Sequence, residues 1–95
     1  MRPGWVYILT NRPNGVLYVG VTSDLVKRAW QHREHVTAGF TSRYEVTRLV
    51  YFEEHAEIEG AIAREKAIKG RRRAWKVRLI LEGSPGWGDL YAGLL

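Results

Sequence analysis

Apolar positions follow a β-strand pattern in two early segments of this chain. Residues 5–10 and 16–21 are rich in apolar, aromatic and β-branched side chains, and the turn formers of residues 12–15 separate them. This arrangement is typical of a β-hairpin. A third apolar run at residues 49–52 predicts a short strand, which we expect to lie in the centre of the sheet.

Helical signals follow the predicted hairpin. Thr22, Ser23 and Asp24 are N-cap candidates for a helix over residues 25–34. Residues 36–44 are rich in glycine, serine and threonine and predict a loop.

The second half of the chain carries two further helical segments. From Ile58 to Ile68 apolar positions recur at intervals of three and four, and Gly70 is placed to end the helix. A second helix is expected over residues 72–81, closed by the turn formers of residues 83–86, and the apolar tail that follows should dock on the body. The element order β-β-α-β-α-α predicts an α+β fold, with a small three-stranded antiparallel sheet (the hairpin plus one strand) and about three helices.

The chain has 95 residues, which suit one domain over residues 1–95 but not two that each bury a core. Hydrophobic residues make up 45% of the chain, so it can fold without a covalent cross-link such as a disulfide bond. The absence of cysteine excludes disulfides, thiolate catalysis and Cys-ligated zinc. No run approaches the roughly 20 apolar residues of a membrane span and no signal-peptide pattern is present, so we expect a cytoplasmic protein without a membrane partner.

Positive charge is concentrated late in the chain. The net charge is +5, and eight of the fifteen Lys and Arg residues lie between Arg64 and Arg78. A basic balance favours a polyanionic partner such as nucleic acid or an anionic membrane. Charge runs are more often solvated helix faces, and the clustering with Trp75 adds weight to the functional interpretation.

Two tyrosines lie on the predicted hairpin. A four-residue loop at residues 12–15 places Tyr7 opposite Gly20 and Leu9 opposite Tyr18, so that both phenol rings share one face of the sheet. A three-residue loop with a bulge would send the rings to opposite faces, and the sequence leaves this open. A glycine inside a strand often marks the close approach of a ligand or another backbone.

Three further side chains could carry chemistry. Arg28 and His32 are four residues apart on the first predicted helix and therefore share a face, from which they could hold a phosphate and exchange a proton. Glu65 lies on the apolar stripe of a later helix, where a carboxylate needs a partner. That partner is either an arginine in a half-buried ion pair or a Mg²⁺ ion.

Together these residues resemble the GIY-YIG nuclease family, in order and spacing as well as in type. Residues 5–7 (Trp-Val-Tyr) occupy the place of the first motif and residues 18–20 (Tyr-Val-Gly) that of the second. Arg28 and His32 match the Arg-x-x-x-His element of the helix after the hairpin, and Glu65 falls where the metal-binding glutamate is expected. The resemblance covers most of the chain.

This resemblance implies a divalent-metal-dependent endonuclease that cuts DNA. Glu65 would bind a single Mg²⁺ or Mn²⁺ ion, and Arg28 would contact the scissile phosphate. Tyr7 would help to activate the attacking water, although a phenol with a pKa near 10 needs a cation beside it to ionise at neutral pH. Tyr18 and His32 would hydrogen-bond around the phosphate and the water. Contacts to nucleic acid are expected from Lys27, Arg64, Lys69, Arg71, Arg72, Arg73 and Lys76.

The match departs from the family pattern at three places. Trp5 stands where the first motif has glycine, and Val21 stands where some members carry lysine. No asparagine follows Asn14, although many members have one downstream of the glutamate, and Ser84 is the nearest candidate for that place.

A domain of 95 residues has little surface with which to contact the bases of a long DNA sequence. We therefore expect low sequence specificity, with DNA structure or nicks as the recognised feature, as in repair or recombination. The alternative is a nucleic-acid-binding module with the nuclease fold and little or no cleavage.

Overall fold

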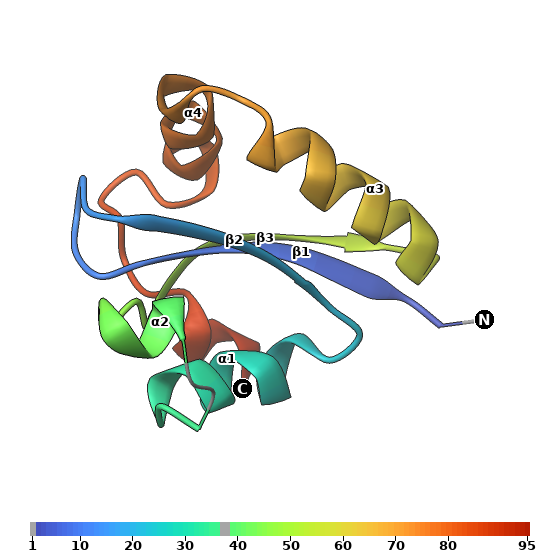
Figure 1. Ribbon diagram of the computed structural model, residues 1–95, viewed down its shortest axis with the longest axis horizontal. Helices are drawn as coiled ribbons and strands as arrows, with labels where there is room; N and C mark the ends of the chain where they lie inside the picture. The colour runs from blue at the N-terminus through green and yellow to red at the C-terminus, as the bar shows by residue number, and fades with distance from the viewer. Residues whose placement is uncertain (1, 37–38) are drawn as a thin grey trace.

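Three antiparallel strands form the middle layer of this computed structural model, which describes residues 2–36 and 39–95 (Figure 1). β1 spans Gly4–Thr10, β2 spans Leu17–Thr22 and β3 spans Arg48–His55, and their order in the sheet is β2-β1-β3. β1 is therefore the central strand, and its residues 6–10 are all buried. The predicted α+β fold with one small antiparallel sheet is confirmed.

The third strand lies at an edge of the sheet, so the expectation that it is central was wrong. Its apolar run reflects burial on both faces: Leu49 belongs to the core on one face, and Val50 to the core on the other. The register of β1 with β3 shifts between Ile8 and Leu9, which leaves Val50 without a directly opposed partner. A continuous apolar run indicates burial on both faces and does not distinguish a central strand from a covered edge strand.

The hairpin has the register that a four-residue loop predicts. Tyr7 pairs with Gly20, and Leu9 pairs with Tyr18. Because directly opposed residues project from the same face, the two phenol rings lie on one side of the sheet. The alternative with a bulged three-residue loop is excluded.

Three longer helices confirm the predicted segments. α1 spans Leu25–Arg33, and the carboxylate of Asp24 caps it by accepting a hydrogen bond of 3.1 Å from the backbone N–H of Lys27. α3 spans Ile58–Lys69 and ends at Gly70 as predicted. α4 spans Arg73–Gly83, so it begins one residue later and ends two residues later than the predicted 72–81.

Two short elements were not predicted. α2 spans Phe40–Arg43, within the segment 36–44 for which the sequence predicts a loop, and η1 is a 3₁₀ helix at Tyr91–Leu94. Thr37, one of the loop-forming residues of that segment, lies outside the described residues. A single helical turn is too short to show the periodicity from which helices are predicted.

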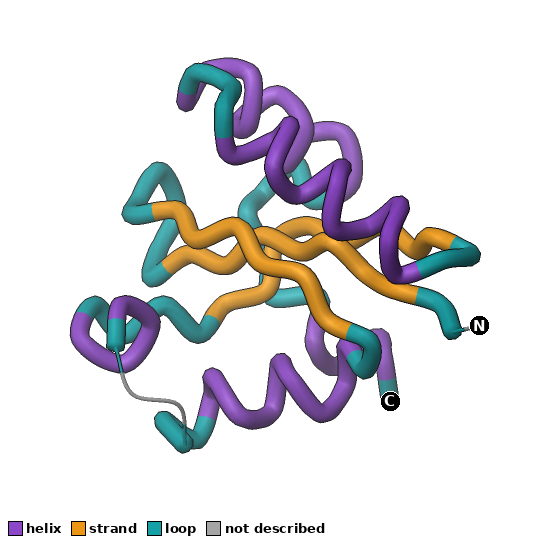
Figure 2. The backbone as a smooth tube through the Cα atoms, turned by 45° about the vertical axis from the view of Figure 1, so that its right-hand side comes forward, coloured by secondary structure: helices purple, strands orange, loops and turns teal. Residues whose placement is uncertain are grey.

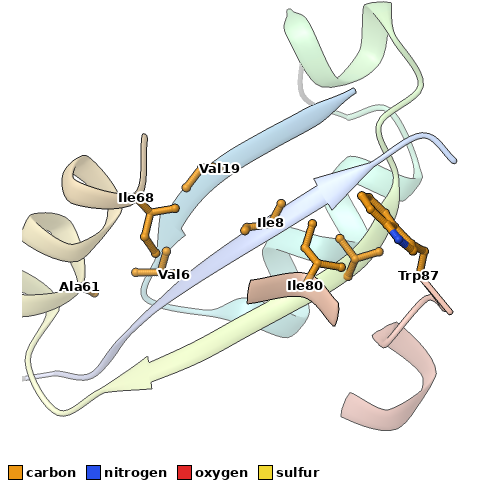
Figure 3. Close-up of a cluster of buried hydrophobic side chains, with 8 residues drawn as sticks. Val6, Ile8, Val19, Ala61, Ile68, Ile80 and Trp87 are labelled. Atoms are coloured by element: carbon orange, nitrogen blue, oxygen red, sulfur yellow. The ribbon is translucent and has the colours of Figure 1, made fainter. Parts of the chain in front are cut away.

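Helices cover both faces of the sheet. α3 and α4 lie on one face, while α1, α2 and the C-terminal segment lie on the other (Figures 1 and 2). The core beneath α3 and α4 is formed by aliphatic side chains of the sheet and of these two helices, together with Trp87 of the tail (Figure 3). Tyr7, Leu9 and Leu25 belong to the core on the opposite face.

The C-terminal segment docks on the body as predicted. Trp87 is buried, and the backbone N–H of Leu90 donates a hydrogen bond of 2.7 Å to the carbonyl oxygen of Leu49. Among the described residues, no helix has the length and apolar character needed to cross a membrane.

Candidate active site

A buried hydrogen-bonded chain of side chains joins the central strand to α1 and α2. The hydroxyl oxygen of Tyr7 lies 3.1 Å from Nε2 of His32, and Nδ1 of His32 lies 2.9 Å from Oγ1 of Thr41. All three residues are buried, with Thr41 the most exposed of them at 4%. Because both ring nitrogens have a partner, the imidazole is held in one orientation.

Burial determines the protonation states of His32 and Tyr7. Burial first, and then the positive charge of Arg28, lowers the pKa of His32 to about 4, so the imidazole is neutral at neutral pH. Burial raises the pKa of Tyr7 to about 12, and the charges of Tyr18 and Glu65 act in the same direction. A hydrogen bond with Arg28 and its charge oppose this rise in the Tyr7 pKa without cancelling it. The phenol is therefore protonated at neutral pH.

Gly20 lets the ring of Tyr7 extend from the central strand to the edge strand. A Cβ atom added at Gly20 would lie 2.4 Å from both Cζ and the hydroxyl oxygen of Tyr7. No side chain could occupy that space while the ring stays in place. The group that lies close to Gly20 is thus the side chain of Tyr7, not the ligand or other backbone that the sequence suggested.

Tyr18 completes a group of three rings at the same place. Its ring centroid lies 6.3 Å from that of Tyr7 and 5.6 Å from that of His32. The predicted shared face of the two tyrosines therefore brings both of them beside the imidazole.

Arg28 and His32 approach Tyr7 from the same face of α1, as their four-residue spacing predicts. Arg28 is half-buried, and its Nη1 donates a hydrogen bond of 3.2 Å to Oε1 of Gln31. Its guanidinium also hydrogen-bonds Tyr7 and acts on the pKa of both Tyr7 and His32. The guanidinium group therefore lies beside the Tyr7 phenol.

Glu65 lies on α3, which covers the opposite face of the sheet (Figure 1). α3 packs on β1 and β2, and the negative charge of Glu65 contributes to the raised pKa of Tyr7. The Glu65 side chain is 12% exposed and forms an ion pair of 2.9 Å with Nζ of Lys69, one turn further along α3. The partner expected from the sequence as an arginine is thus a lysine, whose side chain is 54% exposed.

The surroundings of Glu65 fit a divalent cation held by one carboxylate. Mg²⁺ is commonly bound by one or two carboxylates while substrate phosphates and water complete its coordination. The half-exposed Lys69 can leave the carboxylate for solvent, since a surface ion pair is weak. Within residues 2–36 and 39–95, no group of three or more His, Cys, Asp and Glu side chains could hold a metal by itself.

Ser84, the candidate for the missing asparagine, has a different task in this structure. It is buried, and its Oγ donates a hydrogen bond of 3.0 Å to the carbonyl oxygen of Gly88. The hydroxyl group therefore holds the turn between α4 and the C-terminal segment.

The residues expected to contact nucleic acid lie on several elements and differ in their partners. Lys69 and Lys76 line a groove of about 320 Å³ beside Tyr18. Arg64, by contrast, donates from Nε to the two carboxylate oxygens of Glu53 on β3, at 3.1 and 3.3 Å.

The other expected contacts are spread over further elements. Nη2 of Arg73 donates a hydrogen bond of 2.7 Å to the carbonyl oxygen of Gly15 in the hairpin turn. Arg71 lies over the ring of Trp75 on α4, with 5.0 Å between its Cζ and the ring centroid. Lys27 on α1 and Arg72 before α4 are exposed. Of the expected contacts, Lys69 and Lys76 line the groove that contains Tyr18.

Sequence reasoning missed two residues of α2 that border the candidate site. Thr41 is the partner of the buried imidazole, and Phe40 lies against Tyr18, with 6.0 Å between ring centroids. Neither carries a signal in the sequence, because their segment is one turn long and reaches the site only through tertiary packing.

The fold and this constellation define a GIY-YIG-type domain, with two hairpin tyrosines, an Arg-x-x-x-His helix and a glutamate on a later helix. The model of the GIY-YIG catalytic domain matches residues 3–78. The chain belongs to this family.

The chain is also similar to several UPF0213 proteins. UPF0213 protein DP2720 of Desulfotalea psychrophila is 29% identical over 91 residues, which cover 95% of this chain and 83% of that protein. UPF0213 protein SSP2268 of Staphylococcus saprophyticus is 34% identical over 83 residues, which cover 87% of this chain and 100% of that protein. The solution NMR structure of UPF0213 protein BH0048 from Bacillus halodurans gives a TM-score of 0.54 at 31% identity and covers 87% of this chain and 88% of that one.

Proposed function

We propose that this chain is a divalent-metal-dependent endonuclease that hydrolyses phosphodiester bonds in DNA with low sequence specificity. The proposal is supported by the hydrogen bond between His32 and the buried phenol of Tyr7, and by the charges of Arg28 and Glu65, which both act on the pKa of that phenol. These groups come from the central strand and from helices on both faces of the sheet. Structural ion pairs alone would not require a tyrosine that reaches across a glycine to the edge strand.

Arg28 and Glu65 divide the charge stabilisation that phosphodiester hydrolysis requires. Glu65 would hold the Mg²⁺ or Mn²⁺ ion, which when bound supplies positive charge at the phosphate and lowers the pKa of water. The guanidinium of Arg28 would hold non-bridging phosphate oxygens in a bidentate manner and stabilise the negative charge that grows in the transition state. Each such contact is typically worth about 3 kcal/mol of barrier.

Tyr7 would take part in removing a proton from the attacking water, and His32 would hold the phenol in place. The phenol is protonated in the free protein, so it can orient a water molecule but cannot yet accept a proton from it. If Nδ1–H of His32 donates to Thr41, then Nε2 accepts a hydrogen bond of 3.1 Å from the Tyr7 hydroxyl group and orients the phenol. The positive charges of Arg28 and of a divalent cation at Glu65 would favour the phenolate, so Tyr7 would act as a base only with the metal bound.

The test is incubation of the pure protein with supercoiled plasmid and branched oligonucleotides, in Mg²⁺ or Mn²⁺ and then in EDTA. Nicking that needs metal and is lost in both Glu65→Ala and Arg28→Ala would support the proposal. Glu59→Ala is the matched control, because Glu59 is an exposed glutamate of the same helix. It should nick as the wild type does.

A second candidate function is a nucleic-acid-binding module without cleavage. Two observations favour it: the raised pKa of Tyr7 and the commitment of the Ser84 hydroxyl group to Gly88. This candidate predicts binding of DNA that survives Glu65→Ala and Arg28→Ala, with no strand breakage in any metal. The plasmid assay combined with a binding assay therefore separates the two functions.

A further inference from the structure

Aromatic rings continue from the candidate active site onto the molecular surface. The ring of Tyr18 stacks on that of Phe40 with 6.0 Å between centroids and 28° between planes. Phe40 in turn contacts Tyr44, with 4.7 Å between centroids. The line of rings thus runs from Tyr7 through Tyr18 to two side chains of α2 and its C-terminal cap.

The outer two rings of this line are open to solvent. Phe40 is 44% exposed and Tyr44 is 43% exposed, whereas Tyr7 is buried at 1%. Large exposed aromatic side chains that lie side by side are more often binding surfaces than scattered apolar residues are. We call Phe40 and Tyr44 the aromatic platform.

Basic side chains border the aromatic platform on two sides. Between it and the end of α3 lies the groove of about 320 Å³, which is lined by Phe40, Lys69 and Lys76 among others. A second groove, of about 580 Å³, is lined by Phe40, Tyr44 and Arg43 among others. The guanidinium of Arg43 lies over the Tyr44 ring, with 5.6 Å between its Cζ and the ring centroid.

We propose that the aromatic platform stacks an unpaired nucleobase of the DNA strand whose phosphate is held at Arg28. The recognised substrate class is therefore single-stranded or locally opened DNA. This inference rests on the proposed nuclease function for the position of the phosphate. The stacking surface itself rests on the ring contacts and the exposure of Phe40 and Tyr44.

The combination of exposed aromatic rings and neighbouring cations favours an unpaired nucleobase as the ligand of the aromatic platform. Exposed aromatic rings beside lysine and arginine are the features by which proteins bind single strands, because each base offers a flat face and each phosphate a charge. Bases within an intact duplex are stacked on their neighbours and offer no free face to a protein ring. The platform should thus contribute to binding of unpaired DNA and little to binding of a duplex.

Fluorescence anisotropy tests this with a labelled oligothymidylate and a labelled duplex of equal length. The measurement is made with EDTA, so that cleavage does not interfere. Phe40→Leu keeps an apolar side chain against Tyr18 but removes the ring, and it should weaken binding of the single strand by about five- to tenfold. Binding of the duplex should change by less than about twofold.

Two controls isolate stacking. Phe52→Ala removes a phenylalanine of similar exposure, 38%, from β3 at the opposite edge of the sheet, and it should leave binding of the single strand unchanged. An oligonucleotide of abasic sites keeps the phosphates but lacks the bases. The wild type should bind it more weakly than oligothymidylate, whereas Phe40→Leu should bind the two more nearly alike.

Equal loss of single-strand and duplex binding in Phe40→Leu would overturn the inference, as would equal affinity of the wild type for the abasic and thymidine strands. A wild-type dimer in light scattering that Phe40→Leu dissolves would also overturn it, because it assigns the platform to a second copy of the chain. The circular dichroism spectrum of Phe40→Leu shows whether it is folded, and Tyr44→Leu serves as the second variant if it is not.

The experiment separates this inference from the proposed nuclease function. Because binding is measured without metal, an absence of nicking in the plasmid assay leaves the base-stacking result intact. Conversely, metal-dependent nicking with no effect of Phe40→Leu on single-strand binding refutes the platform alone.

Discussion

Protonation of His32 should remove a large share of the stability of this protein between pH 6.5 and pH 4. The pKa of the imidazole is lowered from 6.5 to about 4 in the folded protein, first by burial and then by the charge of Arg28. Within that window the unfolded chain binds a proton that the folded chain does not. Stability therefore rises with pH across the window, and the contribution is complete above pH 6.5.

The magnitude follows from the displacement of the pKa. Each pKa unit corresponds to about 1.4 kcal/mol, and the window spans the interval from 6.5 to about 4. The free energy of unfolding should thus fall by about 3 kcal/mol on acidification through this one group. Such a loss is a substantial part of the total stability of a small protein.

Urea denaturation of the wild type, His32→Asn and His35→Asn at a series of pH values measures this contribution. Acidification should destabilise the wild type by about 3 kcal/mol more than His32→Asn, since the variant lacks the titrating group. His35→Asn is the matched control, because His35 is exposed and its positive φ of 54° is one that asparagine readily adopts. The pH dependence of the control should follow that of the wild type.

A direct titration of the imidazole provides the decisive readout. Long-range proton–nitrogen NMR spectra report the pKa of His32 and identify which ring nitrogen carries the proton. A pKa near 6.5, or parallel loss of stability in the wild type and His32→Asn, would show that burial does not keep the imidazole neutral. The hydrogen-bonded chain from Tyr7 to Thr41 would then be wrong.

Three further substitutions test the surroundings of the site. Gly20→Ala places a methyl group against the ring of Tyr7, and we expect a loss of about 1–3 kcal/mol in urea denaturation; unchanged stability would mean that the ring lies elsewhere. Thr41→Val leaves Nδ1 of the buried imidazole without its partner, so we expect an altered tautomer in the nitrogen spectrum and slower nicking, and an unchanged spectrum would contradict the observed contact. Lys69→Met removes the cation paired with Glu65 and should tighten Mn²⁺ binding about two- to fivefold in titration calorimetry, whereas weaker binding would show that Glu65 is not the metal ligand.

Local patterns of residues made the main elements predictable. The hairpin, three helices and the end of α3 at Gly70 follow from alternation, three-and-four spacing and turn formers, all of which act over a few neighbouring residues. The central position expected for β3 was wrong, because burial on both faces gives an edge strand the same apolar run as a central one. The single turn of α2 left no periodicity to detect.

The sequence also predicted some features of the candidate site and not others. Spacing along α1 predicted that Arg28 and His32 share a face, and the resemblance to the GIY-YIG family indicated Glu65. Neither could show that Glu65 pairs with Lys69, or that Thr41 holds the imidazole. These contacts depend on how the helices on the two faces are placed relative to the sheet.

By itself, the sequence determined the three strands, the three longer helices and the order in which the chemically important residues occur along them. The tertiary structure alone decided the hairpin register, the burial that keeps His32 neutral and the passage of the Tyr7 ring across Gly20. The physical reason is the range of the interactions. Helices and turns form through neighbours, whereas the hydrogen bond between Tyr7 and His32 joins residues 25 positions apart and exists only once the sheet and helices have packed.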